Sequence, residues 1–162
     1  MFSIRNASNQ DIPLIRELTF RIWPQTYSSI LSQQQIDYML EMMYSESSLQ
    51  KQMNEGCQFI VVYDEKVPVG FASYQEIRQS VYKLHKIYIL PSQQGKGTGR
   101  FVIHHILGDI KRRGASALQL QVNRFNKAKD FYERLGFKKI DEADFDIGDG
   151  YFMNDYVMEK IL

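Results

Sequence analysis

The chain has 162 residues, of which 44% are hydrophobic and 24% charged, a composition typical of one globular domain. The net charge of +1 provides no field to attract nucleic acid, and apolar runs such as 59–63 are far shorter than the roughly 20 residues of a membrane-spanning helix. These features predict a single domain over residues 1–162 and exclude disorder, nucleic-acid binding and membrane insertion.

The N-terminus and the cysteine content indicate where the protein works. Residues 1–5 alternate like a strand and lack the basic start and apolar stretch of a signal peptide, which predicts a cytoplasmic protein. The single cysteine, Cys57, excludes an internal disulfide. It has no Cys or His partner at ligand spacing, so we expect no metal.

Hydrophobic periodicity and turn residues divide the chain into alternating elements. Ser8 has the position of a helix N-cap, and Pro24 marks the expected end of the first helix. The predicted strands are 2–6, 59–63, 67–74, 82–89, 117–122, 137–140 and 151–160. The predicted helices are 9–23, two weaker ones within 25–55, then 97–113 and 126–135.

A glycine-rich loop, residues 93–100, lies between a predicted strand and a predicted helix. Glycines let the backbone approach a ligand closely, and the first N–H groups of a helix are unpaired donors that suit phosphate. The loop therefore predicts an anion site.

Spacing decides between three glycine fingerprints. A Walker loop would need glycine at Leu90 and Ser or Thr at Gly97, and a dinucleotide fingerprint would need glycine at Arg100 or Val102. Both fail. The remaining pattern, Gln94-x-x-Gly97-x-Gly99, resembles the pyrophosphate loop of the Gcn5-related N-acetyltransferase (GNAT) superfamily.

A second block strengthens this resemblance. Asn126, Ala128, Phe131-Tyr132 and Gly136-Phe137 are similar to the helix and turn that follow the fifth strand of that superfamily. The resemblance implies an α/β (α+β) GNAT fold, with a mixed, mostly antiparallel central sheet of about seven strands flanked by helices. It also implies an acyltransferase that uses acetyl-coenzyme A as co-substrate.

The resemblance further implies where the co-substrate binds. The pantetheine arm would lie against 87–89, where the fourth and fifth strands splay apart, and the N–H of Ile89 or a neighbour would polarise the thioester carbonyl. Lys96 and Arg100 would balance the pyrophosphate charge. The implied binding residues are Ile87, Tyr88, Ile89, Gln94, Gly95, Lys96, Gly97, Thr98, Gly99, Arg100, Asn123 and Asn126.

Acetylation of an amine needs an acid for the leaving thiolate and a base for the nucleophile. Tyr132 occupies the place where the superfamily carries the tyrosine that protonates the sulfur. The base is open between His85, Glu76 and an ordered water. Strand alternation predicts that His85 shares a face with Ile87 and Ile89.

We expect a primary amine as the acceptor, with a small amine or polyamine favoured. Residues 86–89, 146–148 and 155–158 are similar to bacterial spermidine/spermine acetyltransferases, and the aromatic residues Trp23, Tyr27 and Tyr38 could line an acceptor groove. Acidic residues near the last hairpin could attract a polycation: Asp141, Glu142, Asp144, Asp146 and Asp149. The alternatives are a protein N-terminus or lysine as acceptor, or a non-catalytic acyl-coenzyme A sensor. Relatives also make a homodimer an expectation.

Overall fold

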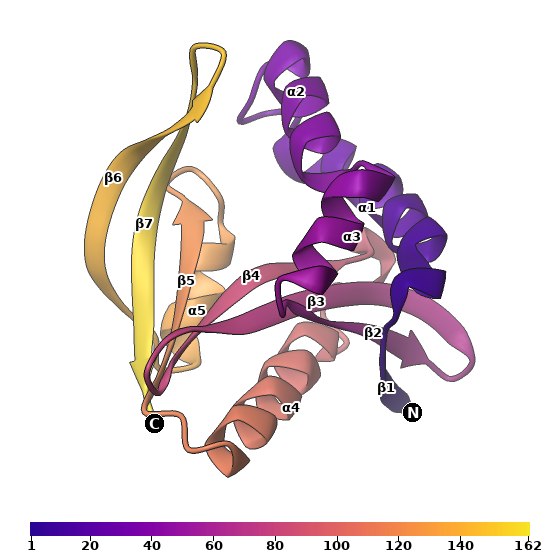
Figure 1. Cartoon of the computed structure of the whole chain (residues 1–162), viewed down its shortest axis with the longest axis vertical. Coiled ribbons are helices and arrows are strands. Elements are labelled where there is room, and N and C mark those ends of the chain that lie inside the picture. The colour runs from indigo at the N-terminus through magenta and orange to yellow at the C-terminus, as the bar shows by residue number, and fades with distance from the viewer.

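The computed structural model describes all 162 residues, and its strands form one mixed sheet in the order β1-β2-β3-β4-β5-β7-β6 (Figure 1). Only β4 and β5 are parallel neighbours, which confirms the predicted mostly antiparallel sheet of seven strands. The strands are β1 (Phe2–Asn6), β2 (Gln58–Asp64), β3 (Val67–Arg78), β4 (Val81–Ile89), β5 (Ala117–Asn123), β6 (Lys138–Gly148) and β7 (Tyr151–Ile161).

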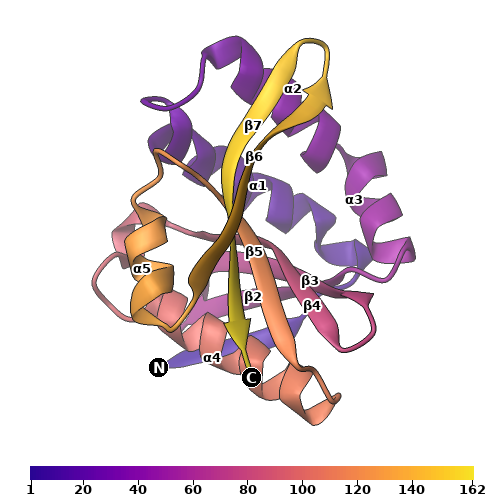
Figure 2. The ribbon, with the colours of Figure 1, turned by 90° about the vertical axis from the view of Figure 1, so that its left-hand side faces the viewer.

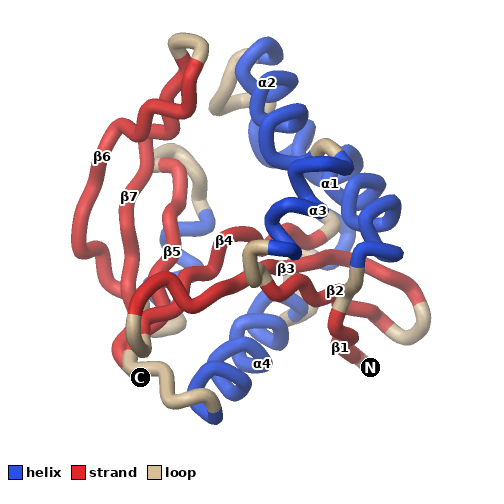
Figure 3. The backbone as a smooth tube through the Cα atoms, viewed as in Figure 1, coloured by secondary structure: helices blue, strands red, loops and turns tan.

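Helices cover both faces of the sheet (Figures 1 and 3). The first three helices lie together on one face. The fourth helix, α4, lies on the other face, and α5 lies near the N-terminal end of α4. A Cβ added at Gly99 of α4 would lie 3.2 Å from the ring of Phe131 of α5, so glycine permits this close packing. The helices are α1 (Ile12–Tyr27), α2 (Gln33–Tyr44), α3 (Glu46–Asn54), α4 (Thr98–Arg112) and α5 (Ala128–Arg134). None of them is long and apolar enough to cross a lipid bilayer.

The first helix begins as the sequence predicts but ends later. Ser8 and Asp11 form a capping box around a short 3-10 turn, Asn9–Asp11, that leads into α1. Pro24 does not end the helix as expected, since α1 continues to Tyr27. The chain tolerates the proline within the last turn, where Thr26 Oγ1 donates to the carbonyl of Ile22 at 3.1 Å.

An aromatic cluster fixes α1 on the sheet. Trp23 is 1% exposed, and its ring centroid lies 4.5 Å from that of Tyr27, 5.5 Å from Tyr44 and 5.8 Å from Tyr88. Trp23 and Tyr44 belong to a core of 30 buried hydrophobic residues that extends through both layers of helices, and Tyr27 and Tyr88 pack against this core. The position of α1 over β4 is therefore set by packing of large rings.

Strands β4 and β5 part halfway along their length. They pair only from Val81 with Ala117 to Leu84 with Leu120. Beyond that point β4 stays paired with β3 as far as Ile89, and β5 stays paired with β7 as far as Asn123. Each strand follows its other neighbour, so a gap opens between them, as the family resemblance implies.

The last hairpin extends much further than predicted. The expected strand 137–140 is only the start of β6, whose mostly exposed residues give little hydrophobic alternation. The hairpin tip contacts α2 (Figure 2), where Tyr38 Oη donates to the carbonyl of Ile147 at 2.6 Å. Gln35 Nε2 likewise donates to the carbonyl of Phe152 at 2.7 Å.

Candidate active site

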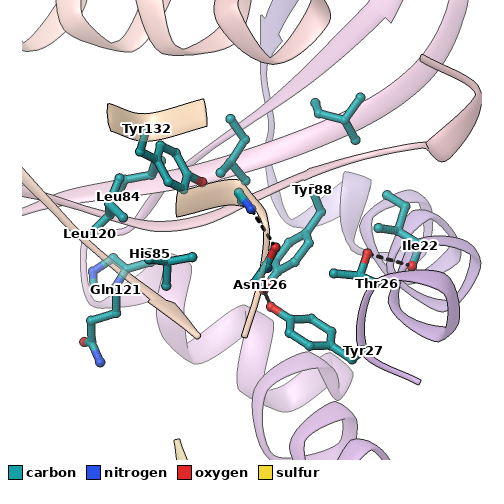
Figure 4. A pocket seen from close by; sticks show the side chains of 14 residues that line it. Ile22, Thr26, Tyr27, Leu84, His85, Tyr88, Leu120, Gln121, Asn126 and Tyr132 are labelled. Carbon is teal, nitrogen blue, oxygen red and sulfur yellow. Dashed lines mark hydrogen bonds between the residues drawn. The ribbon is translucent and has the colours of Figure 1, made fainter. Parts of the chain in front are cut away.

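A cavity lies where β4 and β5 part (Figure 4). Its walls come from α1, from both strands, and from α5 with the turn before it. Aliphatic and aromatic side chains make up most of the lining, and several carry polar groups. The lining side chains with a polar group are Thr26, Tyr27, His85, Tyr88, Gln121, Asn126 and Tyr132. This combination is typical of a small-molecule site.

A β-bulge places His85 at the start of the gap. Ser73 of β3 pairs with Lys86 and Tyr74 pairs with Leu84, so His85 is an extra residue without a partner. The bulge interrupts the alternation, and Leu84 and Ile87 consequently share a face. The prediction that His85 shares a face with Ile87 and Ile89 is wrong, because it meets Gln75 on the other side, with Nε2 3.2 Å from Gln75 Oε1.

Burial and nearby cations keep His85 neutral. Burial is the main cause that lowers its pKa to about 4, and the charges of Lys83 and Lys86 contribute in the same direction. Lys86 is itself buried, with Nζ 5.0 Å from the centre of the Tyr44 ring, and burial lowers its pKa to about 8. His85 is thus a weak base at neutral pH.

Tyr132 of α5 has the geometry of a proton donor. Its ring packs 5.7 Å from that of Phe137, and the residue is 7% exposed. The phenol forms no hydrogen bond within the protein, and Figure 4 shows its oxygen directed into the cavity. Burial raises the pKa of Tyr132, so the phenol remains protonated at neutral pH and has a proton to give.

Two further tyrosines form the opposite wall. The hydroxyl groups of Tyr27 and Tyr88 share a hydrogen bond of 3.0 Å across the contact between α1 and β4 (Figure 4). Burial raises the pKa of each well above its usual value. Of the aromatic residues predicted for an acceptor groove, Tyr27 lines the cavity, Trp23 lies in the core, and Tyr38 binds the hairpin tip.

The backbone of β4 directs a donor into the gap. The N–H of Leu90 donates to the carbonyl of Val69, on the β3 side, at 2.8 Å. Successive N–H groups point to opposite sides of a strand, so that of Ile89 points away from β3, toward the gap. This orientation suits the predicted polarisation of a carbonyl by Ile89.

The glycine loop presents several unpaired N–H groups. Within the predicted set 94–100, the N–H of Gln94 donates to Pro91 and that of Lys96 to Gln93. The other five have no acceptor in the protein: Gly95, Gly97, Thr98, Gly99 and Arg100. Five free donors at the start of a 15-residue helix are the arrangement that the predicted anion site requires.

Side chains beneath the loop hold it in shape. Gln93 is 6% exposed, accepts a hydrogen bond from Thr98 Oγ1 at 2.8 Å and donates to Asp64 at 3.2 Å. Lys96 forms an ion pair with the same carboxylate at 3.7 Å, whereas Arg100 is exposed and has no ion-pair partner in the protein. Arg100 is therefore the freer of the two predicted charge partners.

Substituting Gly97 by alanine should weaken binding of acetyl-coenzyme A. Gly97 has φ +83°, a left-handed conformation that costs other residues about 1–2 kcal/mol. We expect the KM for acetyl-coenzyme A to rise roughly fivefold to thirtyfold, by the conversion of that energy into affinity. Gly108→Ala is the matched control, because Gly108 lies within α4 at a helical position with room for a methyl group. Equal KM values in the two variants would contradict this role of the loop.

The two predicted asparagines shape the turn between β5 and α5. The N-cap of α5 is Lys127 and not Asn126 as expected, but Asn126 Oδ1 accepts from the N–H of Ala128 at 2.9 Å, and Asn126 lines the cavity. Asn123 Oδ1 accepts from the N–H of Phe125 at 2.9 Å and lies outside the lining. Both side chains support the turn, and Asn126 alone also reaches the cavity.

Glu76 lies away from the cavity. It is exposed near the turn between β3 and β4, where its carboxylate accepts from the N–H of Ser80 at 3.2 Å. The structure therefore brings Tyr132 and His85 together and leaves Glu76 outside.

Some residues near the site were absent from the predicted set. Gln121 and Thr26 line the cavity. Asp155 of β7 is 2% exposed and bonded to Gln121. The alternation of residues 117–122 could have indicated that Gln121 faces away from the core, but burial of Asp155 depends on distant segments.

Comparison with known families identifies the class of protein. Residues 28–159 match the model of the acetyltransferase (GNAT) domain. The chain therefore belongs to the GNAT family of N-acetyltransferases, which are acyltransferases.

Two relatives of known sequence match different shares of the chain. The uncharacterized N-acetyltransferase YuaI of Bacillus subtilis is 30% identical over 152 residues, covering 91% of this chain and 86% of that protein. The ribosomal protein bS18-alanine N-acetyltransferase of Haemophilus influenzae is 34% identical over 73 residues. That match covers 45% of this chain and about half, 49%, of the relative.

Solved structures share the fold over the whole chain. The PaiA N-acetyltransferase of Thermoplasma acidophilum, solved in complex with coenzyme A, has a TM-score of 0.84 at 24% identity, covering 100% of this chain and 99% of its own. The ribosomal-protein-S18-alanine N-acetyltransferase of Escherichia coli has a TM-score of 0.75 at 20% identity, covering 99% and 94%. At 24% and 20% identity, both likenesses show a shared fold alone.

Proposed function

We propose that the protein transfers the acetyl group of acetyl-coenzyme A to an amine by direct attack within a ternary complex. One observation carries this proposal: the cavity joins the open edge of β4 to the phenol of Tyr132. The loop of free N–H groups begins just beyond the end of β4, within reach of a molecule that has both a pyrophosphate and a thioester.

The residues present fit acetyl-coenzyme A as co-substrate. The five free N–H groups and Arg100 would hold its pyrophosphate, and the edge of β4 at 87–89 would hold the pantetheine arm. The N–H of Ile89 would polarise the thioester carbonyl, and Tyr132 would give its proton to the departing sulfur.

Direct attack is favoured over a covalent enzyme intermediate. The one cysteine, Cys57, lies outside the cavity lining, where its thiol donates to Gln75 Oε1 at 3.2 Å. Burial raises the pKa of Cys57 and so reduces the fraction of reactive thiolate.

The contacts favour an acceptor with one charged amine over a polycation. Two lysines, Lys83 and Lys86, flank His85 on β4 near the cavity and would repel additional cations. In the acidic hairpin, Arg124 pairs with Glu142 and Asp144, which reduces the attraction of the hairpin for a polyamine. A small amine or the N-terminus of a peptide is the acceptor that we favour.

The test is release of thiol from acetyl-coenzyme A across spermidine, simple primary amines and peptides with a free N-terminal alanine. Turnover of a monoamine or peptide above that of spermidine supports the proposed acceptor class, and preferential turnover of spermidine contradicts it. Tight binding of coenzyme A without turnover of any amine would contradict the transferase proposal and favour a sensor.

A further inference from the structure

Asp155 of β7 is a buried carboxylate without a cation. The residue is 2% exposed and takes part in no ion pair. Its single hydrogen bond comes from Gln121 Nε2, which lies 3.3 Å from Oδ2. Buried carboxylates are normally paired, because removing their charge from water is costly.

The second oxygen of Asp155 remains available. This oxygen, Oδ1, accepts no hydrogen bond. Three side-chain polar atoms are both fully enclosed and without a partner, and Oδ1 is not among them: Trp23 Nε1, Ser73 Oγ and Arg124 Nε. Oδ1 therefore retains some access to solvent. A largely buried carboxylate with one free, accessible oxygen can receive a cationic ligand.

The charged groups around Asp155 leave it without direct compensation. From β4, Lys83 Nζ donates to Gln121 Oε1 at 2.5 Å, so the amide of Gln121 lies between the lysine and the carboxylate. Arg124, just beyond the end of β5, forms ion pairs with Glu142 and Asp144. These two residues flank Ala143, the residue of β6 that pairs with Asp155.

Asp155 lies beside the cavity wall, bonded to the lining residue Gln121, and is not itself a lining residue. From α1, Tyr27 is close enough for the charge of Asp155 to contribute to its raised pKa. Gln121, which holds Asp155, lines the cavity together with His85 and Tyr132. Burial raises the pKa of Asp155 to about 6, two units above that of His85. Asp155 is therefore the stronger base of the two.

We infer that Asp155 receives the ammonium group of the acceptor and removes its proton, and that Gln121 positions the carboxylate. This inference rests on the proposed function. Asp155 takes one proton from the ammonium; the amine nitrogen then bonds to the acetyl carbon as the carbon–sulfur bond breaks. Tyr132 protonates the sulfur, and one of the two protons left on the nitrogen passes through water to the Tyr132 oxygen, while the amide product keeps the other. Asp155 then releases its own proton to solvent.

Kinetics of Asp155→Asn test the inference. The amide keeps the shape of the side chain but cannot take the proton. In the wild type, kcat/KM should rise with pH around a midpoint near 6, the pKa of Asp155. In the variant this limb should disappear, with kcat/KM lower by about 100-fold, the usual contribution of a general base. Asp37→Asn, an equal charge change on the exposed face of α2, should retain the wild-type profile.

The inference would be overturned if kcat/KM of Asp155→Asn still rose with pH around this midpoint, or if its activity stayed within about threefold of wild type. Turnover that depends on Tyr132 would in that case still support the proposed function, so the two can fail separately. A carbon-13 NMR titration of Asp155, assigned by its absence from the variant spectrum, provides a readout independent of turnover. With coenzyme A bound, spermidine or an alanine peptide should lower the midpoint of the Asp155 titration, since an adjacent cation favours the carboxylate. A lowered midpoint without turnover would support the ammonium site while the transferase proposal fails. An unchanged midpoint with every amine would overturn the site.

Discussion

Tyr132→Phe is expected to lower kcat by about 100-fold or more, the usual contribution of a general acid. The hydroxyl is the only group of Tyr132 that the substitution removes, and it forms no hydrogen bond within the protein. The ring would keep its contacts with Phe131 and Phe137. We therefore expect the KM for acetyl-coenzyme A and the thermal stability to stay near the wild-type values, so that the loss appears in kcat.

Tyr82→Phe is the matched control for this experiment. Tyr82 is also buried, at 6% exposure, and its hydroxyl likewise makes no hydrogen bond, but it does not line the cavity. Steady-state kinetics with the best amine should show wild-type turnover for Tyr82→Phe. If Tyr132→Phe kept turnover within about threefold, the proton for the sulfur would have to come from another donor, such as water.

Trp23→Ala is expected to destabilise the fold by about 3–5 kcal/mol, the usual cost of truncating a large core aromatic. Trp23 contacts the rings of Tyr27, Tyr44 and Tyr88, so the cavity left behind would adjoin three elements. Loss of this support should also displace Tyr27 and Tyr88 from the wall of the active site. Urea unfolding measures the first effect, and kcat/KM at a temperature where the variant is folded measures the second.

Trp23→Phe separates packing from hydrogen bonding. The indole Nε1 is buried without a partner, so phenylalanine removes an unsatisfied donor and keeps an aromatic ring in place. We expect it to cost less than half as much stability as the alanine substitution. Equal destabilisation by the two variants would mean that the indole nitrogen makes an essential interaction.

The fold and the loop of free N–H groups could be predicted because their signals are local in the sequence. The glycines at 95–99 and the pair Phe131-Tyr132 lie in short motifs of fixed spacing. Helical and strand periodicity likewise placed most elements within a few residues of their observed bounds. The last hairpin was an exception, because β6 buries little apolar surface and so has little periodicity to detect.

The acceptor side could not be predicted in the same way. The alternation of polar and apolar residues along β4 does not indicate the bulge at His85, because the bulge depends on the register of β4 against β3. The burial of Asp155 depends on residues far apart in the chain, namely Gln121 beside it and Tyr27 across from it. Such features arise only when the sheet and its covering helices are assembled.

The contact between α2 and the hairpin tip joins segments that lie far apart in the chain. Tyr38 and Gln35 bind the carbonyls of Ile147 and Phe152, which are 109 and 117 residues away. A Cβ at Gly148 would come within 2.6 Å of the Tyr38 hydroxyl, which shows how closely they fit. A two-stranded hairpin is only marginally stable by itself. The order of the hairpin tip therefore depends on the docking of α2, and loosening that helix would also release the tip.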